Sequence, residues 1–284
     1  MFKNVRISVV LSIVLAFMFV VAGCGTAAKD SAGSQASGTN AQTTNAQTTE
    51  AAESVELTIS AAASMTDALK DIQQAYETKN PNIKLNFNFG ASGALQQQIE
   101  QGAPADLFLS AATKNMKALV DKQLIDANQQ KNLLSNELVA VAAADGSASV
   151  ASVEDLSKSD VKNIAIGIPE SVPAGGYAKE ALTSAKLWDA LQSKMVQGKD
   201  VRQVLQYVET GNADVGFVYK TDALTSDKVK VAFTVDPKTY TPVEYPIGIV
   251  KATKHNKEAE DFYSYLQTQE ALDVFVKYGF SIPN

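Results

Sequence analysis

The segment Ile59-Ser-Ala-Ala-Ala-Ser-Met-Thr-Asp-Ala-Leu69 joins a strand to a helix through a turn of small residues. The β-branched run Val55–Ile59 predicts the strand, and apolar residues at helical spacing predict a helix over residues 65–79. Ser64 stands where a helix N-cap belongs, and Asp67 follows at the capping-box position. A helix start carries unpaired N–H groups and about half a positive charge, so the turn can also hold an anion. Two interpretations of Ser64 therefore stay open, a simple cap and a ligand contact.

Strand-like and helical patterns alternate along the rest of the chain. This alternation predicts an α/β fold whose sheets contain mainly parallel strands. Further strand-like runs cover residues 83–89, 106–109, 137–143, 164–168, 215–218, 229–233 and 246–250. Further helical patterns cover residues 94–101, 113–122, 177–185, 201–210 and 257 to the C-terminus.

Two more turns between a strand and a helix repeat the pattern of small residues. Ser92 follows the strand 83–89 and can present both its N–H and its hydroxyl. The loop 168–177 is stiffened by two prolines, while Gly175 and Gly176 permit a close backbone approach. Both turns are therefore candidates for contact with a ligand.

A third turn precedes the helix 201–210. Val201 lies in the first helical turn with a free N–H, and Asp200 is most simply the N-cap. A carboxylate at this position would oppose a bound anion unless it faced away. Arg202 is a tempting counter-ion, but a solvated surface arginine is the simpler interpretation.

The N-terminus has the pattern of an export signal. Lys3 and Arg6 precede an apolar run that ends in Val21-Ala-Gly-Cys24, which resembles a bacterial lipoprotein signal peptide with its lipid-accepting cysteine. We therefore expect a signal peptide over residues 1–23 and a lipid on Cys24. Residues 24–54 are rich in Ala, Ser, Gly, Thr, Gln and Asn, which predicts a flexible tether to the membrane.

Composition excludes several classes of function. The formal net charge is −6 at pH 7, which argues against binding to nucleic acid. Cys24 is the only cysteine and no metal-ligand spacing is present, so we expect no disulfide and no metal site. A serine hydrolase needs a base beside its nucleophile, yet the single histidine, His255, lies in a polar segment. Asp106 and Asp214 are interpreted as structural caps or hydrogen-bond anchors.

Six segments, taken in order, resemble the molybdate-binding proteins of bacterial ABC importers. No single segment is specific, but the ordered set extends over essentially all of residues 55–283. The segments are Ala61–Thr66, Gly102–Ala111, Val172–Leu182, Asp200–Arg202, Gly216–Tyr219 and Lys277–Phe280.

The resemblance implies a type II periplasmic-binding-protein fold, in which two α/β lobes are joined by crossing strands and a ligand cleft lies between them. We expect residues 55–135 plus 250–284 in the first lobe and 136–249 in the second, with strands 137–143 and 246–250 as the crossings. The matching ligand positions are Ser64 and Ser92 through N–H and hydroxyl, Ala174 and Val201 through N–H, and Tyr219 through its phenol.

The ligand implied by the resemblance is molybdate or tungstate, with no further cofactor. Roughly seven neutral donors can satisfy the four oxygens of such a dianion without a buried lysine or arginine. The implied partner is the permease of an ABC importer, and the protein is expected to be a monomer, anchored by lipid on the extracytoplasmic face of the cell membrane. Sulfate, phosphate or an organic solute stays open as an alternative ligand, and a secreted serine hydrolase as an alternative class.

Overall fold

The computed structural model describes residues 54–146 and 149–283 of the 284-residue chain. Residues 51–284 form one compact unit, whose described part contains all of the elements named below. The expected signal peptide, Cys24 and all but the last residue of the expected tether lie outside the described residues. In the described part, no helix is both long enough and apolar enough to cross a membrane.

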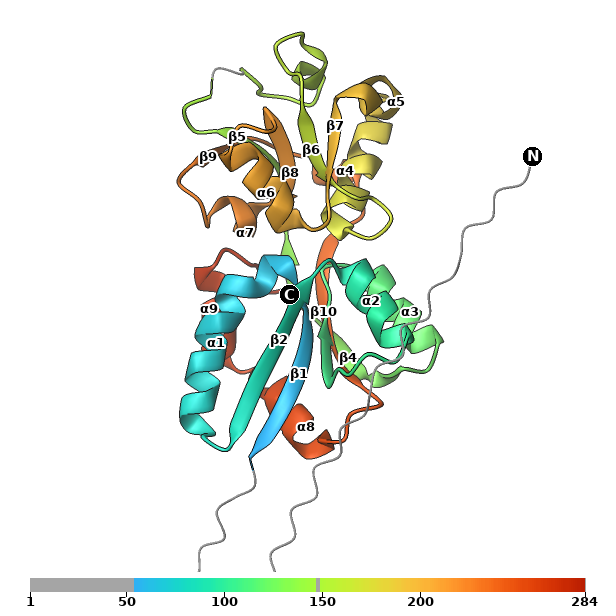
Figure 1. Ribbon diagram of the computed structural model, residues 1–284, viewed down its shortest axis with the longest axis vertical. Coiled ribbons are helices and arrows are strands. Elements are labelled where there is room, and N and C mark those ends of the chain that lie inside the picture. Colours follow the sequence, from blue (N-terminus) through green and yellow to red (C-terminus); the bar gives the residue numbers. More distant parts are fainter. Residues whose placement is uncertain (1–53, 147–148, 284) are drawn as a thin grey trace, which may run out of the picture. The chain divides into compact units, whose positions relative to one another are not determined.

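The first sheet contains β1 (Val55–Ala62), β2 (Ile83–Gly90), β3 (Leu107–Leu109), β4 (Ile125–Asn136) and β10 (Val243–Val250). The strand order is β2-β1-β3-β10-β4 (Figure 1). β1 pairs in parallel with β2 and β3, whereas β10 is antiparallel to β3 and β4, so one strand opposes the other four.

Helices cover both faces of this sheet. Successive residues of a strand face opposite sides, so Phe108 of β3 packs against α2 (Ser92–Glu100) and α3 (Thr113–Asp121), while Leu107 and Leu109 face the other core. That other core also contains buried side chains of α1 (Thr66–Lys79), α8 (Asn256–Tyr265) and α9 (Gln269–Lys277). The first sheet and these five helices are called the first lobe.

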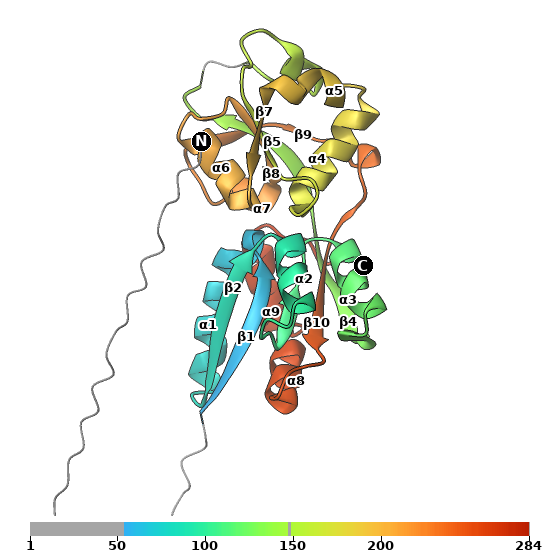
Figure 2. The same ribbon diagram turned by 45° about the vertical axis from the view of Figure 1, so that its right-hand side comes forward.

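The second sheet contains β5 (Leu138–Ala143), β6 (Ile164–Gly167), β7 (Met195–Gly198), β8 (Val215–Tyr219) and β9 (Val229–Thr234), in the order β7-β6-β8-β5-β9. Here β5 alone runs against the other four. α4 (Pro173–Ser184) and α6 (Val201–Glu209) contact β6 and β8 (Figure 2), and α5 (Trp188–Leu191) and α7 (Lys220–Ala223) complete the second lobe. The mixed, mainly parallel α/β fold predicted from the alternation is confirmed.

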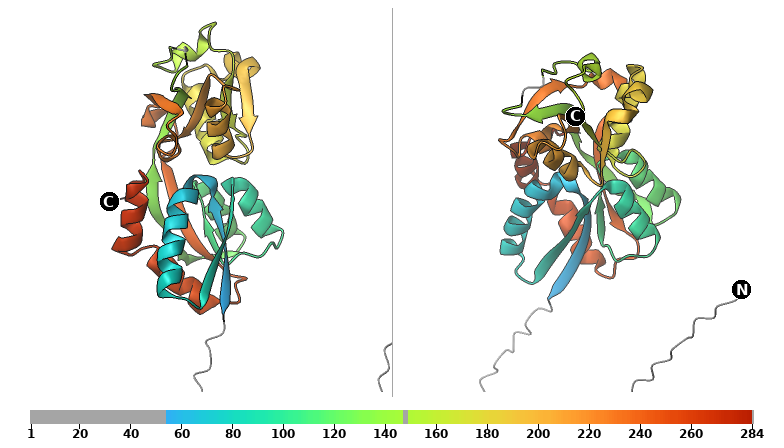
Figure 3. Two further views of the ribbon diagram at one scale, coloured as in Figure 1. Left: turned by 60° about the vertical axis from the view of Figure 1, so that its left-hand side comes forward. Right: turned by 45° about the horizontal axis from the view of Figure 1, so that its top comes forward.

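The chain passes between the lobes twice. It leaves the first lobe at Glu137, between β4 and β5, and returns through residues 235–242, between β9 and β10. Val243 at the start of β10 pairs with Asn136 at the end of β4, so the two crossings lie side by side (Figure 3). The expected division assigned residues 136–249 to the second lobe. Because β10 pairs with β3 and β4, residues 243–249 instead belong to the first sheet.

The sequence predictions missed two strands, β4 and β7, and placed several boundaries differently. β4 has many polar residues, because it lies at the edge of its sheet with much of its length exposed, and its alternation is correspondingly weak. β7 has only four residues and also forms an edge. α4 begins at Pro173 rather than at residue 177, since proline is readily accommodated in the first turn of a helix.

Candidate functional site

All five residues that sequence reasoning proposed as ligand contacts line one cavity between the lobes. The cavity has a volume of about 10 Å³, roughly the room for one water molecule. A tetrahedral anion with four oxygens is larger, so its entry requires the walls to move apart. The first lobe contributes Ala62, Ala63, Ser64, Gly90, Ala91, Ser92 and Ala111, and the second contributes Val172, Pro173, Ala174, Val201 and Tyr219.

Three of the five residues lie at the starts of helices. Ser92 and Val201 are the first residues of α2 and α6, where N–H groups have no partner inside the helix. Pro173 opens α4 without an N–H, which makes Ala174 the first residue of that helix with a donor. The positive ends of three helix dipoles therefore lie at one cavity, in which negative charge is stabilised.

Ser64 does not cap its helix. It lies within η1, the 3-10 turn Ala63–Met65, and neither η1 nor α1 has a side-chain cap. The Ser64 hydroxyl instead lies 2.9 Å from the Tyr245 hydroxyl, and the Asn136 amide donates to Tyr245 at 3.3 Å. Tyr245 can donate to Ser64 while it accepts from Asn136, and this arrangement leaves the Ser64 proton available for a ligand. The capping-box prediction for Ser64 and Asp67 was wrong.

Ser92 also has a hydroxyl that is free to donate. Its Oγ accepts the N–H of Ala111 at 2.9 Å, and the side chain is almost completely buried. This acceptor role fixes the oxygen beside the start of α2 while leaving the hydroxyl proton unused. Ser92 can therefore supply two donors to one anion, its N–H and its O–H.

Tyr219 places a buried hydroxyl without a partner at the cavity. The residue is 1% exposed, and its Oη has no hydrogen-bond partner in the described part of the protein. Burial raises the pKa of the Tyr219 phenol well above its usual value, so the group stays a neutral donor. Its ring also packs edge-on against Tyr245, with 5.8 Å between centroids. A buried hydroxyl left unpaired is costly, and this one is free to donate into the cavity.

The two charged residues around Val201 have different roles. Asp200 is the N-cap of α6, as predicted, and accepts the N–H of Gln203 at 2.8 Å. Arg202 is not a solvated surface arginine: its Nη2 lies 2.7 Å from Asp67 and its Nε lies 2.7 Å from Asp222. Neither Asp200 nor Arg202 lines the cavity. The interpretation of Arg202 was wrong because both partners are distant in sequence.

The walls of the cavity carry no formal charge, since every lining residue in the described part of the protein is Ala, Gly, Pro, Val, Ser or Tyr. Across residues 54–146 and 149–283, no cluster of three or more His, Cys, Asp or Glu side chains is arranged to hold a metal ion. The donor set of hydroxyls and backbone N–H groups suits an oxyanion.

The remaining candidates from the sequence lie away from the cavity. Asp106 accepts the N–H of Thr58 at 2.7 Å, and Asp214 accepts the N–H groups of residues 162 and 163, both at 2.8 Å, so both are hydrogen-bond anchors, as predicted. His255 is the N-cap residue of α8 and does not line the cavity.

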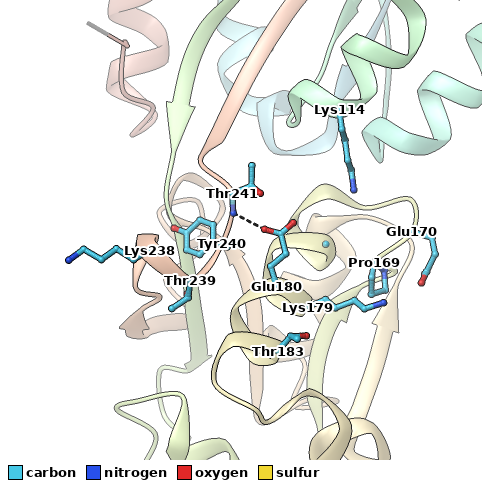
Figure 4. Close-up of a pocket in the computed structure, with 11 residues that line it drawn as sticks. Lys114, Pro169, Glu170, Lys179, Glu180, Thr183, Lys238, Thr239, Tyr240 and Thr241 are labelled. Atoms are coloured by element: carbon cyan, nitrogen blue, oxygen red, sulfur yellow. Dashed lines mark hydrogen bonds between the residues drawn. The ribbon is translucent and has the colours of Figure 1, made fainter. Parts of the chain in front are cut away.

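A larger hollow, of about 780 Å³, lies beside α4 and is open to solvent (Figure 4). Lys114 reaches it from α3, while Lys179 and Glu180 come from α4. Glu180 accepts the N–H of Thr241 at 2.6 Å. These charged side chains of both signs are exposed, so this hollow lacks the fixed, buried neutral donors of the smaller cavity.

The sequence pattern of the family described as bacterial extracellular solute-binding protein matches residues 57–281. The chain belongs to this family. The Bacillus subtilis protein YvgL is 54% identical over 81% of the chain and 87% of the relative. That protein is named as a provisional ABC transporter substrate-binding lipoprotein. The molybdate-binding protein ModA of Haemophilus influenzae is 42% identical over 81% of the chain and 91% of the relative.

A solved structure supports the fold of this solute-binding protein. The periplasmic molybdate-binding protein of Azotobacter vinelandii superposes with a TM-score of 0.73, covering 80% of this chain and all of that one, at 23% sequence identity. Identity this low bears on the fold alone. The family binds solutes and is not a family of enzymes.

Sequence reasoning missed the residues that support the site in this solute-binding protein. Tyr245 of β10 contacts Ser64, Asn136 of β4 contacts Tyr245, and no local pattern identifies either residue. Gly93 of the first lobe donates its N–H to the carbonyl of Ser171 in the second at 2.9 Å. A Cβ on Gly93 would lie 2.6 Å from that oxygen, so glycine is required where the lobes meet.

Proposed function

We propose that this protein is the extracytoplasmic component of a bacterial ABC importer that captures molybdate, and also tungstate, in the cavity between its lobes. The observation that carries the proposal is the buried Oη of Tyr219, which has no hydrogen-bond partner among the described residues and belongs to a residue lining a cavity at three helix starts. Ser64, Ser92, Ala174 and Val201 are the other proposed contacts. The name of the Haemophilus influenzae relative supports the choice of anion.

Neutral, fixed donors suit a fully ionised oxyanion. A fully ionised anion offers these donors only acceptor oxygens, whereas a protonated anion would replace one of those acceptors with an O–H. Molybdate and tungstate have nearly the same size and charge, and the site is expected to accept both. Sulfate is smaller and would leave donors unpaired, at a cost of about 1 to 3 kcal/mol for each one.

The proposed attachment and partners follow from the sequence. A lipid on Cys24 and the segment 24–54 would hold the binding unit, as a monomer, at the extracytoplasmic face of the cell membrane. The permease of the importer would receive the anion when the lobes separate. We expect no catalytic turnover, since within residues 54–146 and 149–283 neither a histidine nor a carboxylate lines the cavity beside Ser64 or Ser92.

Calorimetry of the purified, ligand-free protein tests the proposal. Molybdate and tungstate should bind tightly, while sulfate and phosphate at the same concentration should give little heat. Ser92→Ala should weaken molybdate binding by about 1 to 3 kcal/mol, because it removes one donor to the anion. Equal affinity for sulfate and molybdate would refute selection by size, and Ser64-dependent hydrolysis of a generic ester would restore the enzyme alternative.

A further inference from the structure

Arg202 joins two carboxylates that belong to different lobes. Its Nη2 lies 2.7 Å from Oδ2 of Asp67 on α1, in the first lobe. Its Nε lies 2.7 Å from Oδ1 of Asp222 on α7, in the second lobe, to which Arg202 itself belongs. Among the residues that the structure describes, Arg202–Asp67 is the one ion pair that links the first lobe to the second.

Each of these three residues is close in sequence, or hydrogen-bonded, to a proposed ligand contact. Arg202 directly follows Val201 at the start of α6. The second oxygen of Asp222 accepts the backbone N–H of Tyr219 at 3.2 Å. Asp67 lies in the first turn of α1, which begins directly after the turn that contains Ser64.

The two ion pairs differ in burial, and therefore in role. Asp222 is fully buried, and burial raises the pKa of its carboxyl to about 6 in spite of the adjacent guanidinium, so it depends on Arg202 as a counter-ion. Asp67 and Arg202 keep 34% and 26% of their side-chain surface exposed. The pair with Asp222 lies within one lobe and persists when the lobes separate, whereas the pair with Asp67 requires the lobes to be together.

We propose that Arg202 is a positioning residue for the anion site: it anchors Asp222, and through it Tyr219, in the second lobe, and it retains the bound anion by pairing with Asp67 across the cleft. The proposal rests on the proposed function. It explains how an arginine serves the site without lining the cavity, since both carboxylates hold the guanidinium outside the ring of neutral donors. Breaking the pair with Asp67 shortens the residence time of the anion.

Asp67→Asn is the first test, because it removes the ion pair between the lobes and leaves the buried pair with Asp222 intact. Dissociation of molybdate, measured by rapid mixing with a competitor, is expected to be about 2- to 5-fold faster, the range for a partly exposed ion pair. Sodium chloride screens such a pair, so the dissociation rate should rise with salt in the wild type and much less in the variant.

Asp71→Asn is the matched control. Asp71 lies one turn further along α1 and pairs with Lys277 of α9 at 2.9 Å, entirely within the first lobe. The control makes the same change of charge on the same helix, so it is expected to leave the dissociation rate unchanged even where it lowers stability. Arg202→Lys keeps the charge but loses the planar two-sided contact, and should dissociate at least as fast as Asp67→Asn.

The possible results separate this inference from the proposed function. A wild type that binds molybdate, with Asp67→Asn dissociating at the wild-type rate, would overturn the role of Arg202 alone. Equal acceleration by Asp71→Asn would also overturn it, because the effect would then come from any loosening of α1. A wild type that binds none of the four oxyanions would instead refute the proposed function, and this inference with it.

Discussion

Tyr219→Phe removes a single oxygen from the site and tests the proposed function most directly. The Tyr219 hydroxyl is buried, has no partner in the described residues and belongs to a residue that lines the cavity. Phenylalanine keeps the ring and its edge-on contact with Tyr245. The change therefore removes one proposed donor and little else.

The size of the effect follows from the charge of the acceptor. A hydrogen bond to a charged group contributes about 1.5 to 3 kcal/mol, and 1.4 kcal/mol is a factor of ten in affinity. Molybdate is therefore expected to bind about 10- to 100-fold more weakly to Tyr219→Phe. Since the lost hydroxyl has no partner in the part of the chain that the structure describes, the ligand-free variant should be at least as stable as the wild type.

Tyr240→Phe is the control, because it is expected to lower stability and leave molybdate affinity unchanged. The Tyr240 hydroxyl accepts the N–H of Leu138 at 3.1 Å, and Tyr240 does not line the cavity. Phenylalanine would leave that buried N–H unpaired, which should lower the free energy of unfolding by about 1 to 3 kcal/mol while leaving molybdate affinity unchanged. Calorimetry and urea unfolding, applied to both variants, measure the two quantities separately. Wild-type affinity in Tyr219→Phe, or a loss of its ligand-free stability, would refute the assigned role.

Three further changes test the rest of the site. Tyr245→Phe removes the hydroxyl that contacts Ser64, and calorimetry is expected to show molybdate affinity lowered about 3- to 10-fold; an unchanged affinity would mean that Ser64 is oriented in another way. Gly93→Ala brings a Cβ to 2.6 Å from the Ser171 carbonyl, so the lobes should close less well and affinity should fall about 5-fold or more, with little change in ligand-free urea unfolding. Burial raises the pKa of Asp222 from 3.8 to about 6, so ionising this carboxyl costs the folded wild type up to about 3 kcal/mol of stability as pH rises from 4 to 7. Asp222→Asn has no carboxyl to ionise, so its unfolding free energy relative to that of the wild type should rise between pH 4 and pH 7. If the difference between the two proteins stayed constant over this range, Arg202 would already compensate the charge of Asp222.

Local sequence was enough to find the turns that contain Ser64, Ser92, Ala174 and Val201, whereas the assignment of these residues and of Tyr219 as ligand contacts came from the family resemblance. Ser92, Ala174 and Val201 occupy first helical turns, and the signals that start a helix are local: small residues, a proline, and Asp200 as an N-cap. The same turns lack charged side chains in the cavity lining, which agrees with the sequence-based expectation of neutral donors. Strand and helix alternation likewise predicted the α/β fold.

Segments without a strong local pattern were not predicted, because the prediction depends on such local signals. β4 lies at a sheet edge and exposes polar residues along much of its length, so the alternation that reveals a half-buried strand is blurred. Without β4, no local pattern placed β10 in the first sheet, and the boundary of the second lobe was set seven residues too late.

The partners of polar side chains were decided only by the tertiary structure. Ser64 and Tyr245 are separated by 181 positions, and their contact replaces the helix cap that the sequence around Ser64 predicted. Arg202 finds Asp67 only because the two lobes meet. A serine or an arginine has the same local pattern whether it faces water or a partner from the other lobe. The sequence therefore determined the positions of the donors along the chain, and the packing of the two lobes determined which residues contact each polar side chain.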